Sequence, residues 1–146
     1  MRAALELARR AAEEGETPVG CVITDGDGTV LASGRNRRET ERDATAHAEI
    51  EAIREACRQR GDWRLEDCAI YITLEPCPMC AGAILNARIP TVVYGAREAR
   101  SGSCGSVIDL FSENYGFRPR VYGGVLKEEC AAELRAFFER LREKPD

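Results

Sequence analysis

The feature that most constrains the fold is the alternation of strand-like apolar runs with segments of helical periodicity. Residues 1–14 carry apolar side chains at helical spacing, and residues 18–24 and 29–33 are strand-like. The turn between these strands, Asp25-Gly26-Asp27-Gly28, is a strong hairpin signal. Alternation of this kind favours a layered α/β fold. The remaining pattern predicts a polar loop to about residue 45, helices over 46–60, 78–87 and 127–142, strands over 68–74, 91–96 and 120–123, and a glycine- and serine-rich loop over 97–106.

Length and composition fit one globular unit. The chain has 146 residues, of which 44% are hydrophobic and 32% charged, so we expect a single domain over residues 1–146. No run approaches the roughly 20 apolar residues needed to cross a bilayer, and no membrane association is expected. The N-terminal pattern lacks the basic and then apolar blocks of a signal peptide. The sequence therefore predicts a cytoplasmic protein.

The cysteines point to metal binding and not to disulfides. There are seven, an odd and irregularly spaced set that does not form a disulfide framework. Cys77 and Cys80 are close enough in sequence to share a metal ion. The other five are expected to be small buried hydrophobic residues, namely Cys21, Cys57, Cys68, Cys104 and Cys130.

Charge gives an ambiguous signal about nucleic acid. The net charge of −4 argues against a protein that coats nucleic acid, since such domains are usually basic. Arginines nevertheless gather in one eight-residue segment, where they offer planar groups for phosphates and bases. They are Arg35, Arg37, Arg38 and Arg42. Equally, these arginines are expected to be solvated and paired with neighbouring acidic residues, which are Glu39, Glu41 and Asp43.

Two short motifs concentrate the chemistry. His47-Ala48-Glu49 begins the second predicted helix, and Pro76-Cys77-Pro78-Met79-Cys80 joins the third predicted strand to the third predicted helix. The three-residue spacing places the sulfurs of Cys77 and Cys80 on one side of a helical turn. A helix N-terminus favours thiolate over thiol, and proline is well suited to the first helical turn. Two thiolates with one imidazole suit zinc.

The number of ligands distinguishes a catalytic from a structural zinc site. His47 is the only histidine, so His47, Cys77 and Cys80 supply three ligands and leave a fourth tetrahedral position for water. Zinc acidifies such a water into a nucleophile near neutral pH. Glu49 lies two residues from His47, near enough to reach this water without binding the metal. It is predicted to pass the proton to the leaving nitrogen, because ammonia leaves poorly unless it is protonated.

Each motif has a plainer interpretation when taken alone. A Cys-x-x-Cys pair is also found in redox sites and as two buried thiols, and a His-x-Glu pair is common on helices. Together, with a helix and a strand between them, the motifs form the signature of zinc nucleobase deaminases.

Around these residues the sequence resembles the bacterial tRNA-specific adenosine deaminases, the TadA family, within the cytidine deaminase-like fold. The resemblance covers almost the whole chain, and its strongest segments are Thr45-Ala46-His47-Ala48-Glu49-Ile50 and Leu74-Glu75-Pro76-Cys77-Pro78-Met79-Cys80-Ala81-Gly82-Ala83. Further matching segments are Met1-Arg2-Ala3-Ala4-Leu5, Thr17-Pro18-Val19-Gly20, Val93-Tyr94-Gly95-Ala96, Gly105-Ser106, Gly124-Val125-Leu126-Lys127-Glu128-Glu129-Cys130 and Phe137-Phe138.

The resemblance implies a three-layer α/β/α fold with a central five-stranded mixed sheet, and a homodimer with one Zn²⁺ per chain. It implies conversion of adenosine to inosine at the wobble position of a tRNA anticodon, with His47, Cys77 and Cys80 on zinc and Glu49 as the proton shuttle. The positions implied to contact the substrate are Asn36, Ala48, Pro76, Phe138 and Arg142. Otherwise Asn36 is a turn residue, Phe138 a packing residue and Arg142 a solvated charge.

Two departures from the family pattern stand out. Phe117-Arg118-Pro119 replaces a segment in which many relatives have Asn-His, and Ala44 stands where many have proline. Neither touches the zinc motifs, but the first bears on contacts with the RNA loop. Two further hypotheses stay open. One is a deaminase of single-stranded DNA, free guanine or cytidine. The other is an RNA-binding module whose structural zinc is closed by Cys68 or Cys104.

Overall fold

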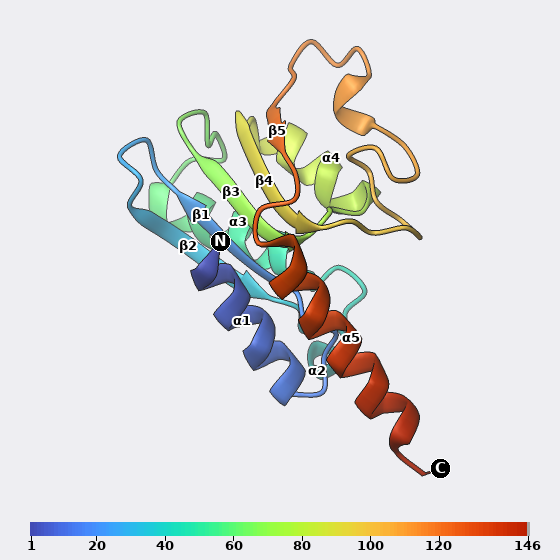
Figure 1. The fold of residues 1–146 in the computed structure, drawn as a ribbon. Helices are drawn as coiled ribbons and strands as arrows, with labels where there is room; N and C mark the ends of the chain where they lie inside the picture. Colours follow the sequence, from blue (N-terminus) through green and yellow to red (C-terminus); the bar gives the residue numbers. More distant parts are fainter. Residues whose placement is uncertain (146) are drawn as a thin grey trace.

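A computed structural model describes residues 1–145 as a mixed five-stranded sheet with helices on both faces (Figure 1). The strands and the four longer helices follow the order expected from the sequence. They are α1 (Arg2–Glu13), β1 (Gly20–Thr24), β2 (Val30–Arg35), α2 (Arg38–Glu41), α3 (Ala48–Arg60), β3 (Ala69–Leu74), α4 (Pro78–Ala87), β4 (Thr91–Ala96), a short 3₁₀ turn η1 (Leu110–Ser112), β5 (Arg120–Tyr122) and α5 (Lys127–Glu143).

The sheet has the strand order β2-β1-β3-β4-β5. β1 pairs antiparallel with β2, as the turn at residues 25–28 predicted, and antiparallel with β3 on its other side. β3, β4 and β5 are parallel, so α4 forms a crossover between β3 and β4. Because β3 and β4 are parallel, their carboxyl ends lie at the same edge of the sheet, where ligands usually bind in such folds.

The helices form two outer layers. α1 and α5 lie side by side on one face, in front of the sheet in Figure 1, and α3 and α4 cover the other. Each face has its own core. The larger core joins the sheet to α3 and α4 through buried residues such as Ile23, Ile70, Ile72, Ala52 and Ile84. The predicted three-layer α/β/α arrangement is confirmed.

One glycine allows α3 to lie unusually close to the sheet. Gly34, on β2, faces the first turn of α3, and a Cβ atom there would overlap the carbonyl oxygen of Ala48. The nearest atoms also include the backbone nitrogen of Ala52, so the obstacle is helix backbone and not a movable side chain. The missing side chain therefore sets the height of the N-terminus of α3 above the sheet.

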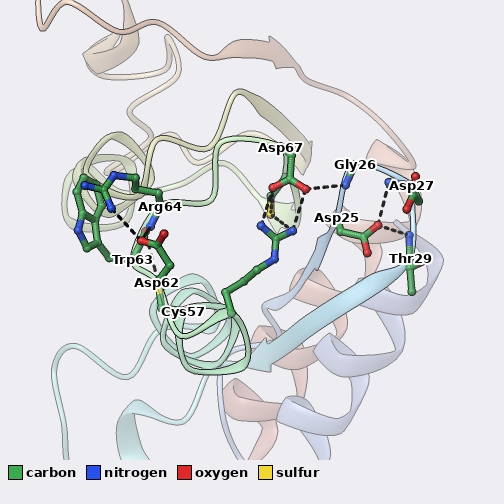
Figure 2. Close-up of polar contacts among 11 residues, drawn as sticks. Asp25, Gly26, Asp27, Thr29, Cys57, Asp62, Trp63, Arg64 and Asp67 are labelled. Atoms are coloured by element: carbon green, nitrogen blue, oxygen red, sulfur yellow. Dashed lines mark hydrogen bonds and ion pairs between the residues drawn. The ribbon is translucent and has the colours of Figure 1, made fainter.

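A polar network fastens the β1–β2 turn to the C-terminal end of α3 (Figure 2). The Arg60 guanidinium donates to both carboxylate oxygens of Asp67, at 2.7 and 2.8 Å, and the Gly26 amide donates to the same carboxylate at 3.2 Å. The paired Arg60 holds the pKa of Asp67 well below its usual range. Asp25 accepts hydrogen bonds from the amides of Asp27 and Thr29 and closes the turn. The hairpin is thus held to the body of the molecule through α3.

The differences from the sequence prediction are local. α2 forms a short helix inside the segment predicted as a polar loop, and η1 was not predicted. His47 caps α3 in an extended conformation and does not lie within the helix. Of the cysteines expected to be buried, Cys57 and Cys104 are only partly buried, while Cys21, Cys68 and Cys130 are buried. Within residues 1–145 no helix has both the length and the apolar composition needed to span a membrane.

Candidate active site

The three predicted ligands converge at the N-termini of two helices. His47 is the N-cap of α3, Cys77 is the N-cap of α4, and Cys80 lies in the first turn of α4. The Nδ1 atom of His47 lies 3.5 Å from the Cys80 sulfur and 3.7 Å from the Cys77 sulfur. The three ligand atoms all lie within 4.8 Å of one another. This places two sulfurs and one imidazole around a common centre.

The local sequence of α4 explains how the two sulfurs are presented. β3 ends at Leu74, and the chain then turns through Pro76 into a helix whose first residue is Pro78. Proline at this position has the fixed φ of a helix and no N–H to leave unpaired. The Ala81 amide donates to the Cys77 carbonyl at 2.9 Å and closes the first turn around both cysteines.

The electrostatics of the cluster favour a metal cation. A hydrogen bond from Cys80 lowers the pKa of Cys77 to about 4, against the opposing effect of burial, and His47 adds to this stabilisation of the thiolate. Conversely, the neighbouring Cys77 thiolate and burial raise the pKa of Cys80. The Cys77 thiolate also raises the pKa of His47. Negative sulfur beside imidazole is the donor set that zinc prefers.

Within residues 1–145, no fourth side chain joins the cluster. Among residues 1–145, only His47, Cys77 and Cys80 bring metal-binding side-chain atoms together closely enough to hold an ion. Cys68 precedes the first residue of β3, at the opposite end of that strand, and its sulfur contacts Asp67. Cys104 is likewise outside the cluster. The arrangement is that of an open site, and it does not support a structural zinc closed by Cys68 or Cys104.

Glu49 lies beside the ligands in the first turn of α3. Its side chain is only 4% exposed, and burial is the largest influence on it, raising the pKa of the carboxyl. Glu49 also lines the same cavity as His47 and Cys77. A buried carboxyl with a raised pKa is well suited to hold and release a proton.

The cavity next to these residues has a volume of about 220 Å³. Sites for drug-sized ligands usually have roughly 300–1,000 Å³, so this cavity suits one flat base better than a larger molecule. Its walls come from six separate parts of the chain. The lining residues are Thr17, Val19, Asn36, Arg38, His47, Ala48, Glu49, Leu74, Glu75, Cys77, Glu98, Ser101 and Phe138.

The structure separates the residues expected to contact substrate. Asn36, Ala48 and Phe138 line the cavity, whereas Pro76 does not. Arg142 lines a neighbouring groove along α5, and Phe138 lies between that groove and the cavity. Phe138 is 41% exposed, as a residue that contacts a ligand requires.

Asn36 is held in place by its own neighbours. Its Nδ2 donates to the Thr17 carbonyl at 3.2 Å, and its Oδ1 accepts from the Arg38 amide at 3.2 Å. A side-chain amide has two N–H groups and an oxygen with two lone pairs, so one donor and one acceptor site remain for a ligand. Asn36 is therefore both a turn residue and an oriented polar group in the cavity.

Several lining residues were not identified from the sequence. Glu75 stands in the sequence only as part of a motif, and Glu98 and Ser101 belong to a loop without regular periodicity. Thr17 and Val19 precede β1 and enter the cavity only because β1 lies beside β3 in the sheet. Periodicity and motif spacing give no signal for these contacts, which depend on strand order and on the path of a loop.

The arginine segment has mixed roles. Arg35 is the last residue of β2, and its guanidinium makes two hydrogen bonds to Glu14, at 2.8 and 2.9 Å. Arg37 pairs with Glu41 at 2.7 Å, and Arg38 lies 3.7 Å from Glu39. The pairing with acidic neighbours is thus present for Arg37 and Arg38, while Arg38 also lines the cavity. Exposed pairs of this kind contribute little stability.

The comparison with protein families supports a zinc-dependent deaminase. The profile of the cytidine and deoxycytidylate deaminase zinc-binding region matches residues 1–96, a span that includes His47, Glu49, Cys77 and Cys80. Over 145 residues the chain is 45% identical to the tRNA-specific adenosine deaminase of Bacillus subtilis strain 168, covering 99% of this chain and 89% of that protein.

Solved structures show the same relationship in three dimensions. One from a study of A-to-I editing by tRNA:A34 deaminases, at the wobble position of transfer RNA, is similar with a TM-score of 0.88 and 44% identity. It covers 92% of this chain and 97% of that one. A guanine deaminase from Bacillus subtilis is similar with a TM-score of 0.65 and 34% identity, covering 99% of this chain and 94% of that one.

Proposed function

This chain belongs to the cytidine and deoxycytidylate deaminase zinc-binding family and, within it, to the tRNA-specific adenosine deaminases, and we propose that it converts adenosine to inosine at the wobble position of a tRNA anticodon. The reaction is a hydrolysis of a C–N bond in a cyclic amidine. Water is added at the purine carbon that bears the amine, and ammonia is released. We also propose one zinc ion per chain. A tRNA substrate supports a cytoplasmic location.

The observation that carries the proposal is the placement of one buried carboxylate beside a three-ligand cluster in a base-sized cavity. His47, Cys77 and Cys80 would hold the zinc, and their chemistry fits that ion. When bound, zinc supplies a Lewis acid that makes water nucleophilic near neutral pH. Binding by three protein ligands distinguishes this cluster from a closed structural site.

Glu49 is proposed to move the protons of the reaction. The carboxylate accepts a proton from water and delivers it to the exocyclic nitrogen, which must leave as ammonia. Its burial in the cavity wall keeps bulk water from competing for this proton. Asn36 and the backbone around Ala48 are proposed to hold the base edge while the proton is transferred.

A single-stranded RNA loop is the proposed substrate because a cavity of about 220 Å³ suits one base. A purine amine cannot reach a buried site while its base is stacked, and extrusion from a loop costs less than extrusion from a duplex. Loops also expose base edges that a duplex hides. The groove along α5 with Phe138 and Arg142 lies at the cavity mouth and is proposed to receive the neighbouring nucleotides.

We further propose a homodimer whose two chains together form the RNA-binding surface. The net charge of −4 does not supply positive charge uniformly. Arginine groups from two chains can be combined into one patch for phosphates.

The deciding experiment compares substrates. We expect inosine to form in an isolated anticodon stem-loop containing the wobble adenosine, with activity falling as salt rises. Free guanine, cytidine and single-stranded DNA of the same sequence serve as competing substrates under identical conditions. If free guanine were the best substrate and the stem-loop were unchanged, the deaminase chemistry would stand and the tRNA assignment would be wrong.

A further inference from the structure

One buried carboxylate near the cluster is not used by the chemistry described above. Glu75 follows β3 and precedes Pro76-Cys77, and only 2% of it is exposed to solvent. It accepts hydrogen bonds from a loop about 25 residues later in the chain, the segment 98–106. Burial of a charge is costly unless it is fully paired, so the partners of Glu75 indicate its role.

The loop surrounds Glu75 with donors. The amide of Glu98 donates to Oε1 at 3.2 Å, and the amides of Cys104 and Ser106 donate to Oε2 at 2.9 and 3.1 Å. The hydroxyl of Ser106 donates to Oε1 as well. Both carboxylate oxygens are thus saturated by neutral donors from one segment of chain. Hydrogen bonds to a charged acceptor are stronger than neutral ones.

Two main-chain hydrogen bonds also attach the loop to the turn that contains Glu75. The Glu75 amide donates to the Ala96 carbonyl at 2.8 Å, and the Ser103 amide donates to the Pro76 carbonyl at 2.9 Å. Residues 96 and 103 are therefore bonded to consecutive residues of the turn that leads to Cys77. The loop and the ligand-bearing turn form one unit.

Gly102 shows how closely the loop follows the carboxylate. A Cβ atom at this position would overlap Oε2 of Glu75, and also the carbonyl of Glu98. The loop therefore passes directly over the carboxylate, with no room for a side chain between them. The contact is specific to this path of the loop.

This loop forms a wall of the cavity. Glu98 and Ser101 line it, together with Leu74 and Glu75 itself. Arg97, Ala99 and Arg100 are exposed, so this part of the loop has little core packing of its own. Four hydrogen bonds from this loop end on the Glu75 carboxylate.

We propose that Glu75 is a positioning residue that fixes residues 98–106 as one wall of the base cavity and thereby sets how tightly the substrate base is held. The identity of that substrate rests on the proposed function, whereas the attachment of the loop does not. A wall that contacts the base equally in the ground state and the transition state affects KM more than kcat.

The test compares Glu75→Gln with a matched control, Glu66→Gln. Glutamine keeps the shape of the side chain but places an N–H group against donors that need an acceptor. Glu66 is an exposed carboxylate that precedes the N-terminal end of β3, whereas Glu75 follows the C-terminal end. Glu66→Gln therefore makes the same chemical change away from the cavity. Ser106→Ala is a milder variant, because it removes one hydroxyl donor and leaves every backbone donor in place.

Three measurements are made on each zinc-loaded protein: amide hydrogen exchange, zinc content and steady-state kinetics with the anticodon stem-loop. For Glu75→Gln we expect exchange at the amides of Glu98, Cys104 and Ser106 to be faster by on the order of tenfold. We expect KM to rise by a similar factor, kcat to change less than about twofold and zinc to be retained. Ser106→Ala should shift exchange and KM in the same direction but less, and Glu66→Gln should match the wild type.

Unchanged amide exchange in Glu75→Gln, or a fall in kcat at constant KM, would overturn the proposal. Loss of zinc from the folded variant would do so too, because it would make Glu75 a support of the metal cluster. If the wild type did not act on the stem-loop at all, the proposed function would fail, and the exchange comparison would still decide the role of Glu75.

Discussion

At the scale of single residues, Glu49 and the three proposed zinc ligands are expected to have separable roles. The proposed ligands meet at the N-termini of α3 and α4. Glu49 lies two residues after His47, in the first turn of α3, and reaches the cavity without joining the cluster. Substitution of Glu49 should therefore remove proton transfer and leave the metal in place.

We predict that Glu49→Gln lowers kcat by about 10²–10⁴-fold while zinc stays at the wild-type level. Glutamine fills the same space but cannot carry the proton. Inosine formation in the stem-loop measures the first quantity, and metal analysis of the folded protein measures the second. A folded Glu49→Gln protein without zinc would show that Glu49 binds the metal.

The cysteines give a second test at this scale. We predict that Cys77→Ser loses zinc and activity, because the hydroxyl replaces the thiolate that the metal requires. Cys104→Ser is the matched control, since it makes the same atomic change in a partly buried cysteine outside the cluster. It should keep both zinc and activity. Loss of zinc from Cys104→Ser would support a closed site.

At the scale of elements, the start of α2 brings positive charge to the cavity, because Arg38 lines it. Arg37 and Arg38 lie at the start of α2, and both are paired with acidic residues in the free protein. We predict that Arg37→Gln with Arg38→Gln weakens stem-loop binding more than it slows conversion in the bound complex. Binding titrations over a range of salt, with single-turnover rates at saturation, measure the two effects.

A control for this variant is Arg58→Gln with Arg64→Gln, which removes two exposed arginines at the far end of α3. A plot of log affinity against log salt should become less steep only for Arg37→Gln with Arg38→Gln. The reason is that each lost phosphate contact reduces the number of released counterions. Equal slopes for both pairs would mean that α2 does not contact the RNA.

The position of α2 itself depends on a buried carboxylate. Glu16, fully buried, accepts hydrogen bonds from the amides of Glu39 at 3.0 Å and Thr40 at 2.8 Å. Burial by itself would raise the pKa of Glu16, but these hydrogen bonds outweigh it and leave the pKa below its ordinary value. The ionised carboxylate therefore stabilises the fold above the unfolded-state pKa of roughly 4.3.

This stabilisation is lost as pH falls through the lower pKa of the folded state. We predict that Glu16→Gln reduces the free energy of unfolding at pH 7. We also predict that this free energy falls less steeply than in the wild type as pH drops below about 4.3. Urea unfolding across this pH range is the measurement, with the exposed Glu13→Gln as control. Parallel curves for Glu16→Gln and the wild type would contradict the assignment.

The elements themselves were largely predictable, because their periodicity is a local property. The helix over 78–87 and the strand over 91–96 have the predicted bounds, and the β1–β2 hairpin followed from its turn residues. α2 was missed because its four residues are all polar and carry no apolar stripe. The donors around Glu75 and the entry of Thr17 into the cavity could not be predicted, since they arise from strand order and from the path of a loop.

At the scale of the whole molecule, the proposed dimer would account for the proposed RNA binding of a chain with a net charge of −4. We predict a dimer at micromolar concentration, measured by sedimentation equilibrium, and loss of stem-loop affinity on dilution below the dimer dissociation constant. A fully active monomer at that concentration would show that one chain carries the complete RNA surface.

The close approach at Gly34 has a consequence for how sequence variation in this protein is interpreted. Any side chain at this position pushes against the backbone of α3, the helix that begins at His47, a proposed zinc ligand, and carries Glu49. Displacement of a reacting group by about 1 Å can cost on the order of 10²-fold in rate. A substitution of Gly34, on the edge strand β2, is therefore expected to impair catalysis. In a mutational survey, the number of substitutions accepted at Gly34 therefore indicates whether catalysis was under selection, although no atom of Gly34 belongs to the site.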